Sequence, residues 1–277
     1  MKGGISMSLP FQAVTFDMDA TFVHDDKSYD HARFERILSQ LEDQGVKVIV
    51  SSGNQYECLT NYFPDTKERL YFVSENGAHV VYQGQDLVQT TVEQAVADEV
   101  LRFLCNDLKL TPSLSGVKHG YVYAKLPAAT LKRQQFYFPN HVLVDDYKDL
   151  PADRYYQLSF LLDPAKVDEQ LAALQDRFGN QVRITPSGNG SVDVTVPGIN
   201  KATALNDLLS SWGLSGADLI AFGDGGNDAE MLKLAKFGYA MKNAGPVAIA
   251  AANHLTALDN NHDGVLAVLE DYLTNQG

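Results

Sequence analysis

The sequence predicts an α/β protein in which a doubly wound parallel sheet carries an inserted α+β domain. Near-continuously apolar segments alternate with amphipathic helical patterns toward both ends of the chain. The middle of the chain instead contains segments in which polar and apolar residues alternate, which is typical of antiparallel strands. With 277 residues, of which 45% are hydrophobic, the chain is long enough for more than one compact unit.

Five short segments are expected to be buried parallel strands. They are apolar almost throughout, as strands are when helices cover both faces of their sheet. They are AVTF (13–16), VKVIV (46–50), LYFV (70–73), LIAF (219–222) and GYAM (238–241).

Two amphipathic helices are expected beside these strands. Residues 31–45 carry an apolar stripe from Phe34 to Leu41 and stop at Gly45, a residue that favours helix ends. Residues 200–213 repeat the pattern. Strands that alternate with helices in this way predict a doubly wound sheet.

The segment from about residue 85 to 188 is predicted to form the inserted domain. Asp163, which precedes Pro164, is expected to cap a helix. The predicted elements are a helix (92–107), a strand (120–125), an irregular stretch, an alternating strand (155–162), a helix (163–179) and two short strands around the turn PSGNG.

Charge and cysteine content narrow the partners. The net charge is −13 and the pI is near 4.8, so phosphate backbones and anionic lipid are repelled and neither nucleic acid nor membrane is expected as a partner. A small anionic substrate is still compatible with this negative charge if a cation bound at the site offsets the protein's negative electrostatic field. Cys58 and Cys105 show no spacing pattern and predict reduced thiols in a cytoplasmic protein. The oligomeric state is not predicted.

The stretch FDMDAT (16–21) places Asp17 and Asp19 where the first predicted strand ends. In an extended chain these two side chains point the same way, toward the sheet edge where ligands bind in such folds. Two neighbouring carboxylates repel unless a cation or a shared proton is present. A divalent cation site and simple turn capping both remain open for this pair taken alone.

Two further positions suit an anion. VSSGN ends the second strand with Ser52 and Gly53, whose hydroxyl and amides can hold an anion or can merely form a turn. Lys201 opens a helix, where its charge opposes the helix dipole, so a compensating anion is expected. A solvated surface lysine is the alternative.

The stretch GDGGNDAEML (223–232) gives the strongest signal. Asp224, Asn227 and Asp228 follow a buried strand within five residues, at the same sheet edge as the first pair. One aspartate would suffice for capping, and oxygen ligands suit Mg²⁺ or Ca²⁺. The cluster therefore predicts a cation site.

Together these motifs resemble the haloacid dehalogenase superfamily, in particular its Cof-type sugar-phosphatase branch with a large α/β cap. The segments that carry the resemblance span the chain in the family's order: FDMDAT, VSSGN, SENGA (74–78), GINKATAL (198–205), GDGGNDAEML and AMKNA (240–244). Ala20 stands where the family usually has Gly, and Asn54 stands where many relatives have Arg. The resemblance implies a Rossmann-like core from residues 1–84 and 189–277, with 85–188 as the cap that selects substrate.

The resemblance also implies roles for the site residues and a cofactor, Mg²⁺. Asp17 is expected to be the nucleophile, and Asp19 the general acid and base. The metal is expected to be held by the Asp17 carboxylate, the Asp19 carbonyl and Asp224, with support from Asp228. The residues expected to hold the phosphoryl group are Ser52, Gly53, Lys201 and Asn227.

The predicted function is hydrolysis of small phosphorylated metabolites, with sugar phosphates the leading class, through an aspartyl-phosphate. A sugar phosphomutase or phosphotransferase, and a non-catalytic phosphate or metal sensor, are the alternatives. Residues 259–270 also match an EF-hand pattern, but the last helix is expected to begin near Gly264, which would draw Glu270 away from Asp259. A calcium loop is therefore not expected there.

Overall fold

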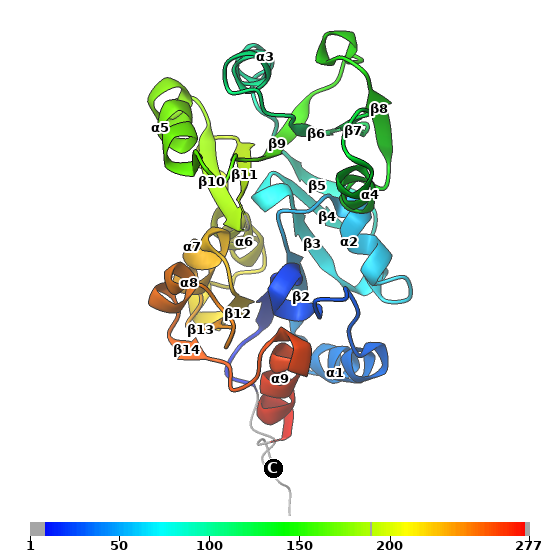
Figure 1. Ribbon diagram of the computed structural model, residues 1–277. Coiled ribbons are helices and arrows are strands. Elements are labelled where there is room, and N and C mark those ends of the chain that lie inside the picture. Colours follow the sequence, from blue (N-terminus) through cyan, green and yellow to red (C-terminus); the bar gives the residue numbers. More distant parts are fainter. Residues whose placement is uncertain (1–8, 189, 275–277) are drawn as a thin grey trace, which may run out of the picture. The chain divides into compact units, whose positions relative to one another are not determined.

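The computed structural model describes residues 9–188 and 190–274 (Figure 1). The strands are β1 (Ala13–Phe16), β2 (Lys47–Ser51), β3 (Tyr71–Ser74), β4 (His79–Tyr82), β5 (Gln85–Gln89), β6 (Ser113–Gly116), β7 (Gly120–Tyr123), β8 (His141–Val144), β9 (Tyr155–Leu161), β10 (Arg183–Gly188), β11 (Ser191–Thr195), β12 (Leu219–Gly223), β13 (Phe237–Ala240) and β14 (His254–Leu255). The α-helices are α1 (His31–Asp43), α2 (Tyr56–Tyr62), α3 (Gln94–Arg102), α4 (Ala128–Tyr137), α5 (Val167–Phe178), α6 (Lys201–Ser211), α7 (Ala229–Leu234), α8 (Pro246–Ala251) and α9 (Gly264–Thr274).

The chain divides into two compact units. Of the described residues, the first contains 9–52, Asp65–Phe72 and 201–274. The second contains Gly53–Pro64, 73–188 and 190–200. The predicted cap segment, 85–188, lies inside the second unit.

The first unit is built on parallel strands, which confirms the predicted fold class. The larger sheet has the order β14-β13-β12-β1-β2-β3-β4-β5, of which β14, β13, β12, β1 and β2 belong to this unit. Within it β1 pairs in parallel with both β12 and β2, whereas β4 and β5, in the second unit, pair antiparallel. Every residue of β1 and β12 is buried, as their apolar sequences predict. Helices α1 and α9 lie on one side of these strands and α6, α7 and α8 on the other (Figure 1). This arrangement brings the carboxyl ends of β1, β2 and β12 to one edge.

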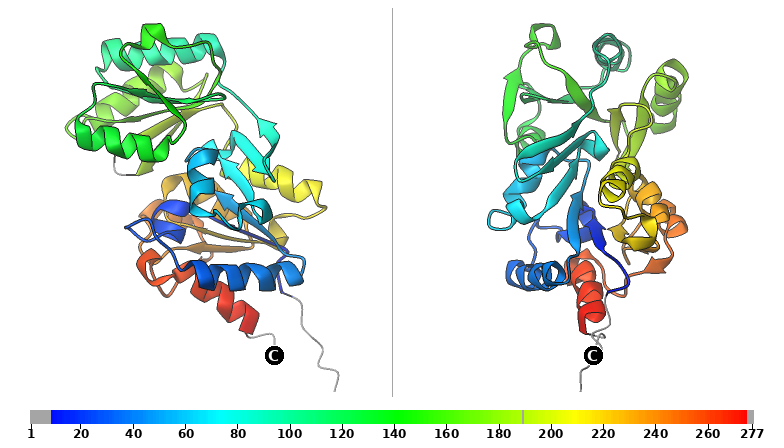
Figure 2. Two further views of the ribbon diagram at one scale, coloured as in Figure 1. Left: turned by 90° about the vertical axis from the view of Figure 1, so that its right-hand side faces the viewer. Right: turned by 180° about the vertical axis from the view of Figure 1, so that it is seen from behind.

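The second unit contains a six-stranded sheet with its own core. Its order is β10-β11-β9-β6-β7-β8, and all the pairs are antiparallel except β7 with β8. Helices α3 and α5 supply core side chains such as Val100, Leu174 and Phe178, which pack with Leu114 and Leu158 from the strands. The layered arrangement of this unit is visible in Figure 2.

The second unit differs from the sequence prediction in several places, and its strands β5 and β6 were not predicted. The stretch read as irregular contains α4 and β8, and α4 has no buried residue, so it carried no apolar stripe to reveal it. Asp163 does not cap α5, which begins at Val167. The Asp163 carboxylate instead accepts a hydrogen bond from the Ala165 amide at 3.0 Å and stabilises a turn before the helix.

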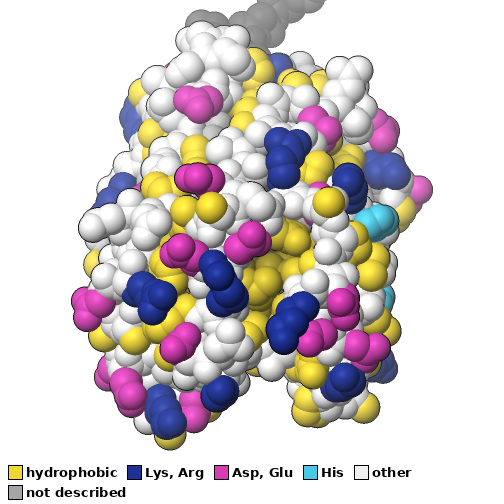
Figure 3. All heavy atoms as spheres, turned by 90° about the horizontal axis from the view of Figure 1, so that it is seen from above, with side chains coloured by type: hydrophobic (Ala, Val, Ile, Leu, Met, Phe, Trp, Pro, Cys, Tyr) yellow, Lys and Arg dark blue, Asp and Glu magenta, His cyan; other side chains and the backbone are white. Residues whose placement is uncertain are grey.

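The surface carries charges of both signs. On the face seen from above, Lys and Arg side chains are interspersed with Asp and Glu side chains (Figure 3). Within 9–188 and 190–274, no helix combines the length and the apolar character needed to span a membrane.

Candidate active site

Asp17 is fixed where β1 ends. Its amide donates to the Phe222 carbonyl of β12 at 3.0 Å, so the strand pairing continues one residue past β1. The side chain is only 7% exposed, and its Oδ1 accepts from Lys201 Nζ at 2.7 Å. A carboxylate in such surroundings is held in one orientation at the edge of the sheet.

Lys201 joins two parts of the site. It is the first residue of α6, is 1% exposed, and also donates from Nζ to Asp228 Oδ1 at 2.6 Å. Burial by itself lowers the pKa of Lys201, but the charges of Asp17 and Asp228 outweigh burial and raise it. The anions that compensate Lys201 in the structure are thus two carboxylates.

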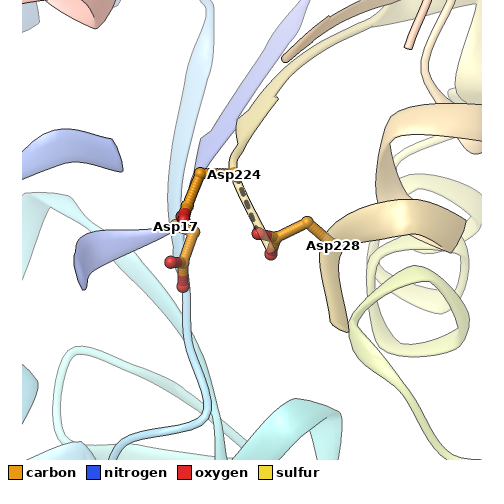
Figure 4. Close-up of side chains that lie close together, drawn as sticks. All are labelled: Asp17, Asp224 and Asp228. Atoms are coloured by element: carbon orange, nitrogen blue, oxygen red, sulfur yellow. Dashed lines mark hydrogen bonds between the residues drawn. The ribbon is translucent and has the colours of Figure 1, made fainter. Parts of the chain in front are cut away.

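The loop after β12 is organised by Asp228. Its Oδ2 accepts from the Asp224 amide at 3.0 Å (Figure 4) and from the Gly225 amide at 2.9 Å. Its Oδ1 accepts from Lys201. Asp228 is fully buried, and a side chain at Gly223 would meet its Cβ at 2.5 Å. Both Asp228 oxygens are therefore already engaged within the protein.

Three carboxylates gather at this edge. Asp17, Asp224 and Asp228 can each offer an oxygen, and these oxygens lie within 4.8 Å of one another (Figure 4). Burial raises the pKa of Asp17 well above its ordinary value, and Asp228 and Asp224 add to this effect while Lys201 opposes it. Burial also raises the pKa of Asp224 to about 6, with a contribution from Asp228.

The acidic group fits a divalent cation. One lysine faces three carboxylates, so two negative charges remain when all are ionised, and a divalent ion would balance them. All the donors are oxygens, which suits a hard cation. Since both Asp228 oxygens already accept hydrogen bonds, Asp17 and Asp224 are the residues best able to coordinate the cation directly.

Asp19 lies apart from this group. The chain leaves the extended conformation after Asp17, and Ala20 adopts a left-handed φ of 58° within the turn Met18–Phe22. The Asp19 carboxylate is consequently not among the three gathered oxygens, and it accepts from Lys27 Nζ at 2.5 Å. About a third of each of these two side chains is exposed, so this carboxylate is open to solvent.

The other residues predicted to bind phosphate lie just after β2 and β12. Ser52 comes directly after β2 and is 2% exposed, and Asn227 lies half-buried in the turn before α7. Gly53 begins the second unit, where its carbonyl accepts from Gln157 Nε2 at 2.9 Å.

Three contacts at the site were not predicted from the sequence. Thr21 Oγ1 donates to Asp224 Oδ1 at 2.9 Å, and Asn243 Nδ2 donates to the Ala20 carbonyl at 2.8 Å. Lys27, which follows the acidic pair Asp25 and Asp26, donates to Asp19. Thr21 and Asn243 lie within the motifs FDMDAT and AMKNA, but Lys27 lies outside every motif, so no sequence signal pointed to its contact with Asp19.

The EF-hand pattern does not form a calcium loop. Helix α9 begins at Gly264, as expected, and Glu270 pairs with Arg33 at 2.6 Å. Asp263 pairs with Arg33 and with His24, and Asp259 pairs with His262. The carboxylates of the pattern are therefore used in separate ion pairs.

Known proteins share this fold and sequence over nearly the whole chain. A family model described as haloacid dehalogenase-like hydrolase matches residues 14–269. The 5-amino-6-(5-phospho-D-ribitylamino)uracil phosphatase of Escherichia coli K12 is 32% identical over 268 residues, covering 97% of this chain and 98% of that protein. An HMP-PP phosphatase of Cronobacter sakazakii is 28% identical over 245 residues, which is 88% of each chain.

A solved structure gives the same result. The protein SMU.1108c of Streptococcus mutans UA159 superposes with a TM-score of 0.90 at 36% identity, covering 95% of this chain and 99% of that one. The named relatives are phosphatases, in agreement with the predicted class of enzyme. The chain belongs to the haloacid dehalogenase-like hydrolase family.

Proposed function

We propose that this protein is a magnesium-dependent phosphatase that hydrolyses small phosphorylated metabolites, with sugar phosphates the leading class. The observation that carries the proposal is the setting of Asp17. It is a buried carboxylate at a strand end, oriented by Lys201 and grouped with Asp224 and Asp228. An oriented carboxylate beside a cation site is what nucleophilic attack on a phosphate ester requires.

Asp17 acts as the nucleophile. One of its carboxylate oxygens forms a bond to phosphorus while the bond from phosphorus to the leaving alcohol breaks, which gives an aspartyl-phosphate. Asp19 donates a proton to the leaving oxygen and later removes one from the water that cleaves the intermediate. The partial exposure of Asp19 supports this role, because a group that exchanges protons with water must reach solvent.

The Asp17 carboxylate, the Asp19 backbone carbonyl and Asp224 would hold the magnesium ion. Asp228 supports them by holding the loop amides and Lys201. When bound, Mg²⁺ offsets the repulsion between these acids and the incoming phosphate. Lys201 keeps Asp17 in place and adds a positive charge beside the phosphoryl group.

Ser52, Gly53, Lys201 and Asn227 bind the phosphoryl oxygens. These residues come from the ends of β2 and β12 and from the start of α6. Hydroxyl, amide and ammonium donors of this kind stabilise the charge that develops during phosphoryl transfer. Segment 85–188 acts as the cap that selects the alcohol part of the substrate.

The relatives narrow the substrate class. The Escherichia coli relative is named for a phosphate on a ribityl chain, which is a polyhydroxylated alcohol. A primary phosphate on a sugar or sugar alcohol is therefore the first class to test.

The test measures phosphate release from p-nitrophenyl phosphate and from sugar phosphates, with Mg²⁺ and with EDTA. We expect release with Mg²⁺, none with EDTA, and loss of turnover by at least about a thousandfold in Asp17→Asn. Asp43→Asn, which changes an exposed aspartate at the end of α1, is the matched control and should behave as wild type. Metal-independent release, or full activity of Asp17→Asn, would refute the assignment.

The alternatives are separated by two additional measurements. A phosphomutase or phosphotransferase would move the phosphate to an added sugar acceptor instead of releasing it. A sensor would accumulate a long-lived aspartyl-phosphate without turnover.

A further inference from the structure

Asp19 lies in a segment of two successive turns, residues 18–28, in the first unit. The second turn is closed by the His24 amide, which donates to the Ser28 carbonyl at 2.9 Å. This turn brings Lys27 to the Asp19 carboxylate. The position of that carboxylate therefore depends on what holds the two turns in place.

Two asparagine side chains hold the first turn and its end. Asn243 Nδ2 donates to the Ala20 carbonyl at 2.8 Å, and Asn260 Nδ2 donates to the Val23 carbonyl at 3.0 Å. The backbone amide of Asn260 also donates to Asn243 Oδ1 at 3.3 Å, so the two asparagines are joined. Asn260 is only 2% exposed. Because Ala20 directly follows Asp19, one of these bonds ends beside the residue that carries the carboxylate.

The second turn is held through Asp25. Asn260 Nδ2 donates to Asp25 Oδ1 at 3.1 Å, and Asn261 Nδ2 donates to Asp25 Oδ2 at 3.0 Å. The Asp25 amide donates back to Asn261 Oδ1 at 2.9 Å. Hydrogen bonds from Asn260 and Asn261 lower the pKa of Asp25, so its carboxylate remains an acceptor at neutral pH. We call Asn243, Asn260 and Asn261 the asparagine clamp.

The EF-hand pattern at residues 259–270 thus has a use other than calcium binding. Asn260 and Asn261 belong to the pattern, and both donate from Nδ2 to oxygens of the two turns. The Gly264 amide donates to the Asp259 carbonyl at 3.0 Å and closes the loop that presents these asparagines. Hydrogen bonds from such supporting residues fix the geometry of a functional side chain.

We propose that the asparagine clamp positions Asp19 for its work as general acid and base, with Asn260 as the central positioning residue. This proposal rests on the phosphatase function proposed above. A carboxyl group that delivers a proton to the leaving oxygen must be placed accurately, because a displacement of about 1 Å can cost about a hundredfold in rate. Asn260 suits this role because its Nδ2 has two hydrogens for its two acceptors, whereas an aspartate would offer acceptors only.

The kinetic test compares two leaving groups. The alcohol of a sugar phosphate needs a proton from Asp19 as it leaves, whereas p-nitrophenolate leaves without one. For Asn260→Leu and Asn243→Ala, kcat/KM for the best sugar phosphate of a panel should fall at least about tenfold. The value for p-nitrophenyl phosphate should stay within about threefold. Equal losses on both substrates, or no loss on either, would overturn the proposal.

A double variant tests whether the clamp acts through Asp19. In Asp19→Ala the general acid is absent, so adding Asn260→Leu should lower kcat/KM for the sugar phosphate by less than about twofold. A merely structural role would give the same loss in both backgrounds and would refute the proposal. If Asn260→Leu does not fold, as judged by circular dichroism, Asn243→Ala replaces it, because Asn243 is exposed.

A matched control changes an asparagine of the same unit that supports another loop. Asn253 Nδ2 donates to the Lys236 carbonyl at 3.2 Å, which joins the residues before β14 and β13. Asn253→Leu should change kcat/KM for either substrate by less than about twofold.

Amide hydrogen exchange tests the clamp without turnover. Exchange of residues 18–28 should be at least about threefold faster in Asn260→Leu and Asn243→Ala than in wild type, and unchanged in Asn253→Leu. Unchanged exchange in both clamp variants would refute the clamp. A wild type that releases no phosphate would refute the phosphatase function and with it the role of Asp19. An active wild type whose clamp variants behave like Asn253→Leu would refute the clamp alone.

Discussion

Replacing Lys201 by methionine should destabilise the first unit by several kcal/mol. The ammonium is 1% exposed and donates to Asp17 at 2.7 Å and to Asp228 at 2.6 Å, so its loss leaves two buried carboxylates without their cation. Removing one partner of a buried ion pair costs about 3–5 kcal/mol. Methionine has a similar length, so little of this cost comes from a cavity.

The cost should also depend on pH. Without Lys201, the pKa of Asp17 rises further above its value in the unfolded chain, because burial and the neighbouring acids are no longer opposed. A carboxyl group whose pKa is raised by folding loses stability as the pH increases through the interval between the two values. The deficit of Lys201→Met relative to wild type should thus be larger at pH 8 than at pH 5.

Urea unfolding in EDTA, followed by tryptophan fluorescence, measures both effects. Trp212 is the only tryptophan of the chain and directly follows α6, so it reports on the unit that contains Lys201. Lys67→Met removes an exposed lysine of the same unit and should shift the free energy of unfolding by less than about 0.5 kcal/mol. A deficit below about 1 kcal/mol at pH 8 for Lys201→Met would refute the reasoning from the buried ion pair.

Three further predictions follow from individual contacts. Thr21→Val removes the hydroxyl that donates to Asp224, and magnesium titrations of activity should show an apparent affinity about tenfold weaker; an unchanged midpoint would contradict the supporting role of Thr21. Lys27→Met should change the free energy of unfolding by less than about 1 kcal/mol, because the ion pair between Lys27 and Asp19 is partly exposed. It should nevertheless alter kcat, because Lys27 contacts the proposed general acid and base. Unchanged kcat would show that Lys27 does not influence Asp19 during catalysis. The stability of Glu75→Gln relative to wild type should rise by at most about 5 kcal/mol between pH 4.5 and about 8, because folded wild type keeps a buried acid protonated that ionises in the unfolded chain. Thermal or urea unfolding measures this difference. A difference that does not change with pH would show that folding does not raise the pKa of Glu75.

The sequence by itself determined the strands of the first unit and the places where their polar ends meet. β1, β2 and β12 are mostly apolar and are followed directly by Asp17, Ser52 and Asp224, so local pattern and the rule for parallel sheets were enough. It did not reveal α4, whose side chains bury nothing and therefore leave no periodic apolar signal. It also placed Asp163 at a helix start, where the structure has only a turn.

The tertiary structure decided which partners each polar group has. Lys201 lies far from Asp17 in the sequence, and only the packing of α6 against the sheet edge makes it a cation shared between two carboxylates. The turn Met18–Phe22 begins directly after Asp17, so the Asp19 carboxylate pairs with Lys27 and is not gathered with Asp17, although alternation along an extended strand would have put them together. Tertiary packing likewise brings Gln55 Nε2 and Glu75 Oε1 to the hydroxyl of Ser115, a residue distant from both in the sequence. Hydrogen bonds between distant segments depend on the three-dimensional path of the backbone, and the local sequence pattern contains no record of that path.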